Sequence, residues 1–473
     1  MNLGPKWKAR GASLIARLTG RSFASSSARS FAKSAGWIGI TFLFSRAIGM
    51  IVPLLAARYL GKEIFGKATL AITVGQFLSM VMLLGMNNAV VRYGAPKHQP
   101  REEVAAALFV TAFATLAVLL VVGLGGGQAL ACTFHFEKDI IHWGVLFALF
   151  ATAYVLTTSF LQAFHRFYER GVGELLTAVS VVFGFGCGVL AYGRHLAAYL
   201  LAICLAFLTA TCYAVYHTKR HLGTMAWPAP HTLRVMTAYG TLSTLGNIGF
   251  ILTFYIQPMI LNKLLSASEV GLFRVYQTAS ITIAQSLSVI FNTVFFPKAS
   301  ASANRKELWR VTWRLWAVAL LPLGAAYILS QLVLIPVAGR DYPLNWNLMG
   351  LFAITSLFIT VQSTVGQFLG AEGVRGVAAG LVVSIVTGSV CVGTSYLLVP
   401  RFHLAGACLA LLFAYAIALV LVILAQEYIL RHGIPGSAQT PEREAGEYRG
   451  AFEAHSASEI LPELASRDKE ENE

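Results

Sequence analysis

The chain has 473 residues, of which 56% are apolar and only 12% are charged. Soluble proteins carry about 25% charged residues, so this composition excludes a soluble protein and predicts one embedded in lipid. The net charge is +14, but the bases stand singly between apolar runs. That pattern is typical of loops beside membrane helices and excludes a nucleic-acid-binding surface.

Residues 1–36 are polar, basic and free of acids, and we expect a cytoplasmic arm held at anionic lipid headgroups. Their Arg and Ser content also resembles a mitochondrial transit peptide, although no secretory signal is present. Twelve apolar runs follow, each long enough for one transmembrane helix. These runs lie near 37–60, 67–92, 104–124, 140–163, 172–193, 196–217, 238–265, 270–296, 311–337, 346–370, 376–400 and 403–430.

The predicted organisation has two sets of six transmembrane helices, an N-lobe at 37–217 and a C-lobe at 238–430, joined by a cytoplasmic linker at 218–237. Residues 431–473 form an acidic cytoplasmic tail that we expect to be disordered. Of the 36 Lys and Arg and 22 Asp and Glu, residues 441–473 hold four and ten, which leaves 32 bases against 12 acids. The bases concentrate in alternate loops, which places both termini in the cytoplasm.

The two lobes repeat each other weakly in sequence. Pro53, Leu60 and Gly66 recur as Pro258, Leu265 and Gly271, at an offset of 205 residues, and the motif His195-Leu196-Ala197 recurs at 403–405. Because each lobe has an even number of helices, the lobes share one orientation. We therefore expect them to be related by an axis along the membrane normal, with a cavity between them.

A succession of short motifs carries a family resemblance over roughly residues 35–430. The chain resembles the polysaccharide and O-antigen flippases of the multidrug/oligosaccharidyl-lipid/polysaccharide exporter superfamily. The motifs are Arg46-Ala47-Ile48-Gly49, the segment 54–66, Leu84-Gly85-Met86 ahead of Arg92, Glu269-Val270-Gly271-Leu272-Phe273, Phe296-Pro297-Lys298, Gly339 with Asp341-Tyr342, and the segment 404–410.

This resemblance implies an all-α membrane fold of about twelve helices in two V-shaped lobes. It further implies alternating access and a cargo of oligosaccharide linked to undecaprenyl pyrophosphate. The chain departs from the family at Gln257, where members often carry an acid in the seventh helix. That departure puts acid-based ion coupling at this point in doubt.

No enzymatic motif stands out. The chain has no Gly-rich phosphate loop, zinc-protease helix or Gly-x-Ser-x-Gly elbow. An integral glycosyltransferase would need acids or histidines in large loops, and the loops here are short. We therefore expect a protein that is not an enzyme and that needs no cofactor and no metal.

Two intramembrane arginines are the sharpest functional signal. Arg46 lies about nine residues into the first predicted helix, or about 13 Å, and Arg274 lies near the start of the eighth. A central Arg costs about 2.5–3.5 kcal/mol on insertion scales, so it normally faces water or a partner. None of the acids outside the tail falls at the centre of a predicted span. The sequence thus predicts a cavity that attracts anions.

Uncharged residues complete the predicted site. Asparagine and glutamine side chains can hydrogen-bond the hydroxyls of a sugar. Two prolines at equivalent positions are candidate hinges, because proline removes a backbone donor and kinks a helix. The predicted cavity residues are Arg46, Arg274, Gln257, Asn262, Asn87, Asn88 and Asn292, and the predicted hinges are Pro53 and Pro258.

The sequence favours a flippase that moves a lipid-linked oligosaccharide across a bacterial inner membrane. The alternatives are a cation-coupled multidrug exporter, a flippase for the peptidoglycan lipid precursor, and a membrane scaffold within a polysaccharide synthesis complex. The expected partners are the lipid-linked oligosaccharide, membrane lipids, and glycosyltransferases or a polysaccharide polymerase, with no nucleic acid.

Overall fold

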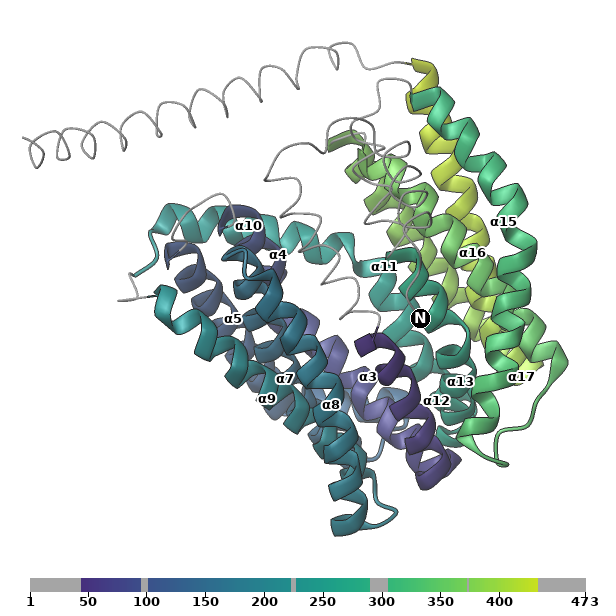
Figure 1. The fold of residues 1–473 in the computed structure, drawn as a ribbon, viewed down its shortest axis with the longest axis horizontal. Coiled ribbons are helices and arrows are strands. Elements are labelled where there is room, and N and C mark those ends of the chain that lie inside the picture. The colour runs from purple at the N-terminus through teal and green to yellow at the C-terminus, as the bar shows by residue number, and fades with distance from the viewer. Residues whose placement is uncertain (1–43, 95–100, 223–226, 290–304, 372–373, 433–473) are drawn as a thin grey trace, which may run out of the picture. The chain divides into compact units, whose positions relative to one another are not determined.

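The computed structural model describes residues 44–94, 101–222, 227–289, 305–371 and 374–432. Within these ranges the chain forms helices joined by short turns, and it contains no strand (Figure 1). The predicted all-α fold is confirmed. The chain divides into two units, 1–423 and 424–473. The described part of the second unit is the end of the last helix, where Arg431 Nε lies 3.7 Å from Glu427 Oε2.

The N-lobe begins with a helix at 44–60, whose start lies outside the described residues. It continues through α3 (Lys62–Leu83), α4 (Met86–Gly94), α5 (Arg101–Val121), a π-helical turn (Val122–Gly126), α6 (Gly127–Phe134), α7 (Lys138–Ala163), α8 (Phe167–Tyr192) and α9 (Leu196–Leu222). Helix α3 contacts α5, α7 and α9 of its own lobe and α12 and α13 of the other. It therefore lies at the contact between the lobes.

The C-lobe contains the remaining helices. They are α10 (Pro230–Gly246), α11 (Ile248–Ile251), a π-helical turn (Leu252–Ile256), α12 (Gln257–Leu264), α13 (Ala267–Ala279), a helix at 281–289, α15 (Arg305–Leu334), a 3₁₀ turn (Ile335–Ala338), α16 (Trp346–Ala371) and α17 (Val374–His432). Helix α10 begins inside the predicted linker at 218–237, and it packs against α4 and α5 of the N-lobe.

Eight helices of the described residues are long and apolar enough to cross a membrane, or nine if the bent pair 230–246 and 248–264 counts as one. One of the eight covers 54 residues of α17, which is enough for two crossings of about 20 residues each. Its backbone reverses locally at His403, where φ is 52°. Helical residues are present in each of the twelve predicted spans.

Three predicted spans are interrupted within the described residues. The second span divides at Leu84 and Gly85, which have φ of 45° and 68°, and the seventh bends by 47° at Asn247. The eighth is interrupted at Ser280, between α13 and the helix at 281–289. Backbone contact explains the break in the second span. A Cβ atom on Gly85 would lie 2.2 Å from the carbonyl oxygen of Gly240 in α10. Glycine at both positions allows α10 to pass directly over the turn between α3 and α4.

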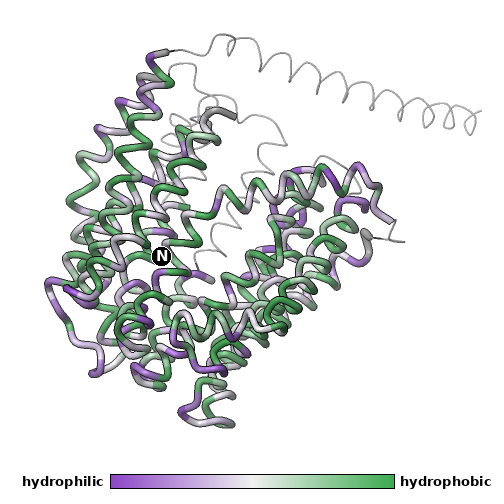
Figure 2. The backbone as a smooth tube through the Cα atoms, turned by 180° about the vertical axis from the view of Figure 1, so that it is seen from behind, coloured by the Kyte–Doolittle hydropathy of each residue, from purple (hydrophilic) through white to green (hydrophobic). Residues whose placement is uncertain are grey.

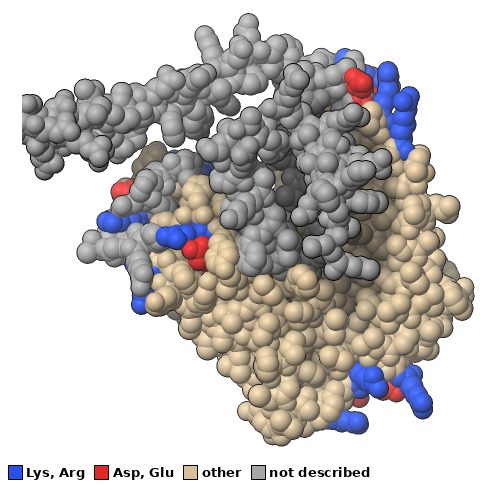
Figure 3. Space-filling model, viewed as in Figure 1, with Lys and Arg blue, Asp and Glu red and all other residues tan. Residues whose placement is uncertain are grey.

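The surface fits a membrane setting. Apolar residues follow the helices for most of their length (Figure 2). Lys and Arg side chains gather near the helix ends, and the face between them is almost free of charge (Figure 3). Large apolar side chains such as Phe113, Phe183 and Leu321 are 70%, 71% and 84% exposed. Lipid is the solvent that makes such exposure favourable.

Contacts between the lobes concentrate where the first and seventh spans end and the second and eighth begin. Gly66 of α3 packs against the backbone of α13. Asn262 Nδ2 donates to the carbonyl oxygens of Phe134 and His135 at 3.0 and 3.3 Å. The Tyr342 hydroxyl donates to the Ala57 carbonyl oxygen at 3.4 Å. We call these contacts the interlobe seam.

Candidate functional site

Three cavities with shared walls lie inside the first unit. One of about 220 Å³ contains both predicted arginines, and we call it the arginine compartment. A second, of about 250 Å³, lies mainly in the N-lobe, and a third, of about 390 Å³, lies in the C-lobe. Gln76 and Tyr255 line both the first and the second, Phe250 lines the first and the third, and Asn247 lines the second and the third. The three therefore adjoin one another, and together we call them the connected region.

The arginine compartment draws its walls from both lobes. The helix at 44–60 contributes Arg46 and Pro53, and α13 contributes Arg274. Arg274 is half-buried, and its Nη1 donates to Gln277 Oε1 at 2.8 Å. Gln277 is itself buried. This bond holds one end of the guanidinium and leaves its other N–H groups for a ligand, since Arg carries five donors.

The electrostatic character of the region is one-sided. Among the described residues that line the three cavities, Arg46 and Arg274 are the charged ones, and no Asp, Glu or Lys is present. A cavity with charge of one sign and walls of low dielectric focuses the field of that charge. The region can therefore concentrate an anionic group, and it repels organic cations.

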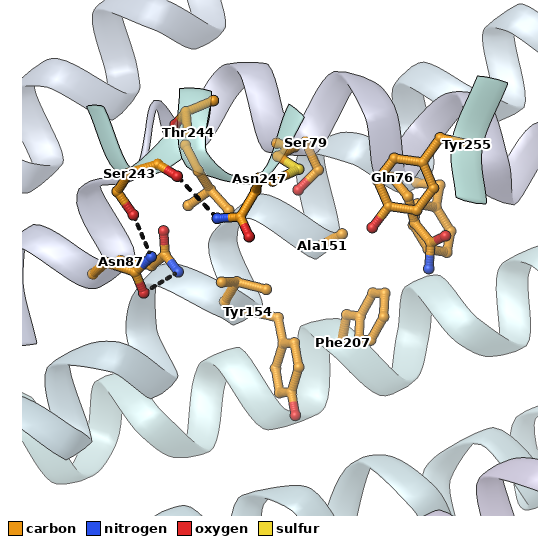
Figure 4. A pocket seen from close by; sticks show the side chains of 16 residues that line it. Gln76, Ser79, Asn87, Ala151, Tyr154, Phe207, Ser243, Thr244, Asn247 and Tyr255 are labelled. Carbon is orange, nitrogen blue, oxygen red and sulfur yellow. Dashed lines mark hydrogen bonds between the residues drawn. The ribbon is translucent and has the colours of Figure 1, made fainter. Parts of the chain in front are cut away.

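The second cavity combines aromatic rings with amides, and we call it the aromatic–amide compartment. Its side chains come from α3, α4, α7, α9, α10 and the π-helical turn 252–256. Figure 4 shows the amides of Asn87 and Asn247 beside Ser243, the rings of Tyr154 and Phe207 across from them, and Tyr255 with Gln76 at the far end. Asn247 lies at the bend between α10 and α11, and it lines the wall of this compartment.

The third cavity is lined mainly by small and uncharged polar residues of α16 and α17. Gln362 and Gln367 present amides, and Ser384 accepts from the Gly249 N–H at 3.1 Å and donates to the Gly246 carbonyl oxygen at 3.0 Å. These two bonds tie α17 to the break between α10 and α11. The cavity is thus anchored to the point at which the seventh span bends.

Residues 31–302 match the family model described as "Polysaccharide biosynthesis protein". The chain belongs to this family. The predicted family resemblance is confirmed. A search of the curated proteins finds no match.

Solved structures show which fold this polysaccharide biosynthesis protein shares. An inward-facing multidrug resistance transporter of the MATE family aligns with a TM-score of 0.61 and 13% identity, covering 82% of this chain and 95% of that one. The lipid II flippase MurJ, in an inward closed conformation, aligns with a TM-score of 0.62 and 13% identity, covering 82% and 87%. A transporter of the MOP superfamily from Pyrococcus furiosus aligns with a TM-score of 0.56 and 12% identity, covering 84% of this chain and 95% of that one. The chain has their two-lobe fold.

The structure brings four of the predicted cavity residues of this family member into the connected region. Arg46 and Arg274 line the arginine compartment, and Asn87 and Asn88 line the aromatic–amide compartment. Asn87 Nδ2 donates to Asn88 Oδ1 at 3.2 Å, and Asn88 Nδ2 donates to Ser243 Oγ at 2.8 Å. Their role in binding a substrate stays a prediction.

Other predicted residues lie elsewhere. Gln257 is buried, and its Nε2 donates to the Ala407 carbonyl oxygen at 2.7 Å, so its amide serves packing within the C-lobe. Asn262 belongs to the interlobe seam. Asn292 lies outside the described residues. We therefore keep none of these three in the proposed site.

The two predicted hinge prolines differ in their surroundings. Pro53 lines the arginine compartment. Pro258 is buried at the start of α12, directly after the π-helical turn 252–256. A missing N–H at Pro258 fits that local change of hydrogen bonding. Hinge movement at either proline stays a prediction.

The sequence interpretation missed several side chains of the region: Gln76, Tyr154, Tyr199, Phe207 and Ser243. Gln76 carries the signal that could have found it, because an amide near the centre of an apolar run is unusual in the same way as Arg46. The aromatic residues carry no such signal. Phe and Tyr are common in membrane helices, and only the structure shows which rings reach the cavity.

Proposed function

We propose that this protein is a transporter that moves an oligosaccharide linked to a polyprenyl diphosphate across a bacterial inner membrane. The diphosphate lies between Arg46 and Arg274, while the prenyl chain stays in lipid. The observation that carries the proposal is the arginine compartment, where one guanidinium from each lobe lines a single cavity whose described walls hold no carboxylate.

The chemistry of guanidinium favours this cargo. Arg forms paired, charge-assisted hydrogen bonds with phosphate oxygens. A diphosphate between two lobes can be held by both arginines at once, which couples binding to the relative position of the lobes. A cationic drug would meet repulsion in the same place. Membership of the polysaccharide biosynthesis family supports a saccharide as the part beyond the diphosphate.

The interlobe seam and the predicted orientation support a headgroup that enters from the cytoplasm. With both termini in the cytoplasm, the seam lies at the outer face, and the structure corresponds to a state closed towards the outside. The headgroup would then enter from the cytoplasm and leave after the seam opens. The expected glycosyltransferases, which build the cargo on the cytoplasmic side, would supply it there.

Transport into vesicles tests the proposal. The purified chain is placed in liposomes with an undecaprenyl diphosphate-linked saccharide, and its arrival in the opposite leaflet is followed by access to an added glycosidase. We expect Arg46→Ala and Arg274→Ala each to reduce the initial rate by about tenfold to a hundredfold, since a hydrogen bond to a charged group contributes about 1.5–3 kcal/mol. Arg314→Ala is the matched control, because Arg314 is exposed at the start of the ninth span.

Three outcomes would contradict the proposal. Equal rates with and without the protein would show that this lipid is not its cargo. Transport of a cationic dye by the same liposomes, unaffected by either substitution, would favour the multidrug exporter instead. A loss of rate in Arg314→Ala equal to that in Arg274→Ala would show that general positive charge, and not the cavity, matters.

A further inference from the structure

The aromatic–amide compartment has features that the diphosphate does not need. We propose that it holds the sugar ring bonded directly to the diphosphate, and that it is where the protein distinguishes one glycan from another. This inference rests on the proposed function, because the diphosphate in the arginine compartment fixes where the first sugar begins. It adds a second subsite, formed mainly by Tyr154, Phe207, Asn87 and Asn247.

One wall of this compartment is an aromatic stack. The rings of Tyr154 and Phe207 are 5.0 Å apart and nearly parallel, at 13°. Phe147 meets Phe207 edge to face at 5.5 Å. The Tyr154 hydroxyl lies beside Thr177 and Glu174 of α8. The faces of aromatic rings are electronegative, so they attract the C–H groups on the flat face of a pyranose.

The opposite side of the compartment offers hydrogen-bonding groups that are still free. Asn87 and Asn247 use their amide N–H groups on Asn88 and on the Ser243 carbonyl oxygen. Within the described residues, no hydrogen bond uses the side-chain carbonyl oxygen of either, nor the amide of Gln76 or the hydroxyl of Tyr255. These groups can accept from, or donate to, sugar hydroxyls.

The position and size of the compartment select the first sugar. Gln76 and Tyr255 line both this cavity and the arginine compartment, so a ring joined to the diphosphate reaches it directly. Ligand pockets usually begin at about 300 Å³, and this cavity measures about 250 Å³. It therefore suits one ring and not a whole repeat unit. The described residues of its walls carry no charge, so a second phosphate would find no opposite charge to bind there.

Binding of paired ligands to the full chain in detergent tests this subsite. The probes are undecaprenyl diphosphate alone and the same lipid carrying one glucose, galactose or N-acetylglucosamine, and native mass spectrometry measures each Kd. We expect the wild type to prefer at least one glycosylated lipid over the bare lipid by about fivefold or more. Tyr154→Ala should lower that preference about threefold to tenfold, as loss of an aromatic contact predicts.

Conservative and distant variants separate binding from folding. Tyr154→Phe keeps the ring face and should retain most of the preference. Asn247→Ala is the second disruptive variant, because Asn247 is exposed and its loss does not open the core. Phe183→Ala removes a ring that is 71% exposed on α8 and should leave the preference unchanged. Gln367→Ala tests the third cavity.

The outcomes are distinguishable from failure of the proposed function. If the wild type binds neither kind of lipid, the lipid-diphosphate cargo is wrong and the subsite falls with it. If bare and glycosylated lipids bind equally for all three sugars, the subsite is wrong while the cargo stands. A preference that survives Tyr154→Ala and Asn247→Ala but disappears in Gln367→Ala would place the sugar in the third cavity and overturn the inference.

Discussion

Gly66 and Gly271 make reciprocal backbone contacts across the interlobe seam. A Cβ on Gly66 would lie 1.7 Å from the carbonyl oxygen of Ala267, and a Cβ on Gly271 would lie 2.3 Å from that of Lys62. Each partner lies four residues before the opposite glycine, and both pairs are 205 residues apart. The contact therefore relates equivalent points of the two lobes, as the sequence repeat predicts.

Enlarging either glycine should open the seam. Gly66→Leu or Gly271→Leu forces backbone atoms apart, and overpacking of this kind costs about 1–3 kcal/mol. We expect the population to shift towards the state that is open on this side by about fivefold to a hundredfold. Spin labels on α3 and α13 measure the shift as a longer distance. Gly350→Ala is the control, because no atom lies within 4 Å of its added Cβ. An unchanged distance distribution in both leucine variants would contradict this role.

The amide of Asn262 should hold the interlobe seam closed, as the two glycines do. Asn262→Ala removes the bonds to the Phe134 and His135 carbonyl oxygens, each of which contributes about 0.5–1.5 kcal/mol. We expect labelling of a cysteine introduced behind the seam to become about threefold to tenfold faster. Asn347→Ala is the control, since Asn347 is exposed in the sequence that follows the 339–345 turn. Equal labelling rates in the two variants would remove Asn262 from the seam.

Burial at the seam also predicts a pH dependence. Burial, with a smaller contribution from Asp341, raises the pKa of Tyr342 above its usual value of 10.0. Folding then favours the protonated phenol, so its contribution to stability is complete below about pH 10 and is lost as the pH rises from there towards the raised pKa. We expect the thermal unfolding temperature of the wild type to fall more steeply above pH 10 than that of Tyr342→Phe. Parallel curves would show that Tyr342 titrates normally.

The sequence predicted the elements of this fold because apolar length and loop charge act locally. Each of the twelve predicted spans contains helical residues where the structure describes it. Gly66 and Gly271 were found as a repeat, but their contact was not, since no local signal says that two helices will approach within a Cβ radius. The breaks at Gly85 and Asn247 were missed for a related reason, because both lie at tertiary contacts. The first depends on packing between α10 and the turn after α3, and the second lies where Ser384 of α17 bonds Gly246 and Gly249.

The sequence predicted those residues of the candidate site whose side chains are unfavourable in lipid. Arg46 and Arg274 stand out because an intramembrane charge requires a wet or paired environment. Amides carry a weaker signal, and that signal does not say where they point. Gln257 packs against Ala407, whereas Gln76, an equally polar residue, lines two cavities. The rotation of each helix about its axis decides whether an amide packs against a neighbour or faces a cavity, and that rotation depends on the tertiary structure.

Replacing Gly85 should lower the stability of the protein by more than backbone strain alone, because Gly85 contacts Gly240. Gly85→Ala places a Cβ 2.2 Å from the Gly240 carbonyl oxygen at a φ of +68°. Gly193→Ala is a matched control, because Gly193 has a φ of +60° and no atom within 4 Å of its added Cβ. Backbone strain at a positive φ costs about 1–3 kcal/mol in either variant, and overpacking adds about 1–3 kcal/mol at Gly85 only. We expect Gly85→Ala to unfold at a clearly lower temperature than Gly193→Ala in a thermal shift assay. If the two variants melt together, the turn after α3 can relax away from α10, and the break in the second span does not depend on that contact.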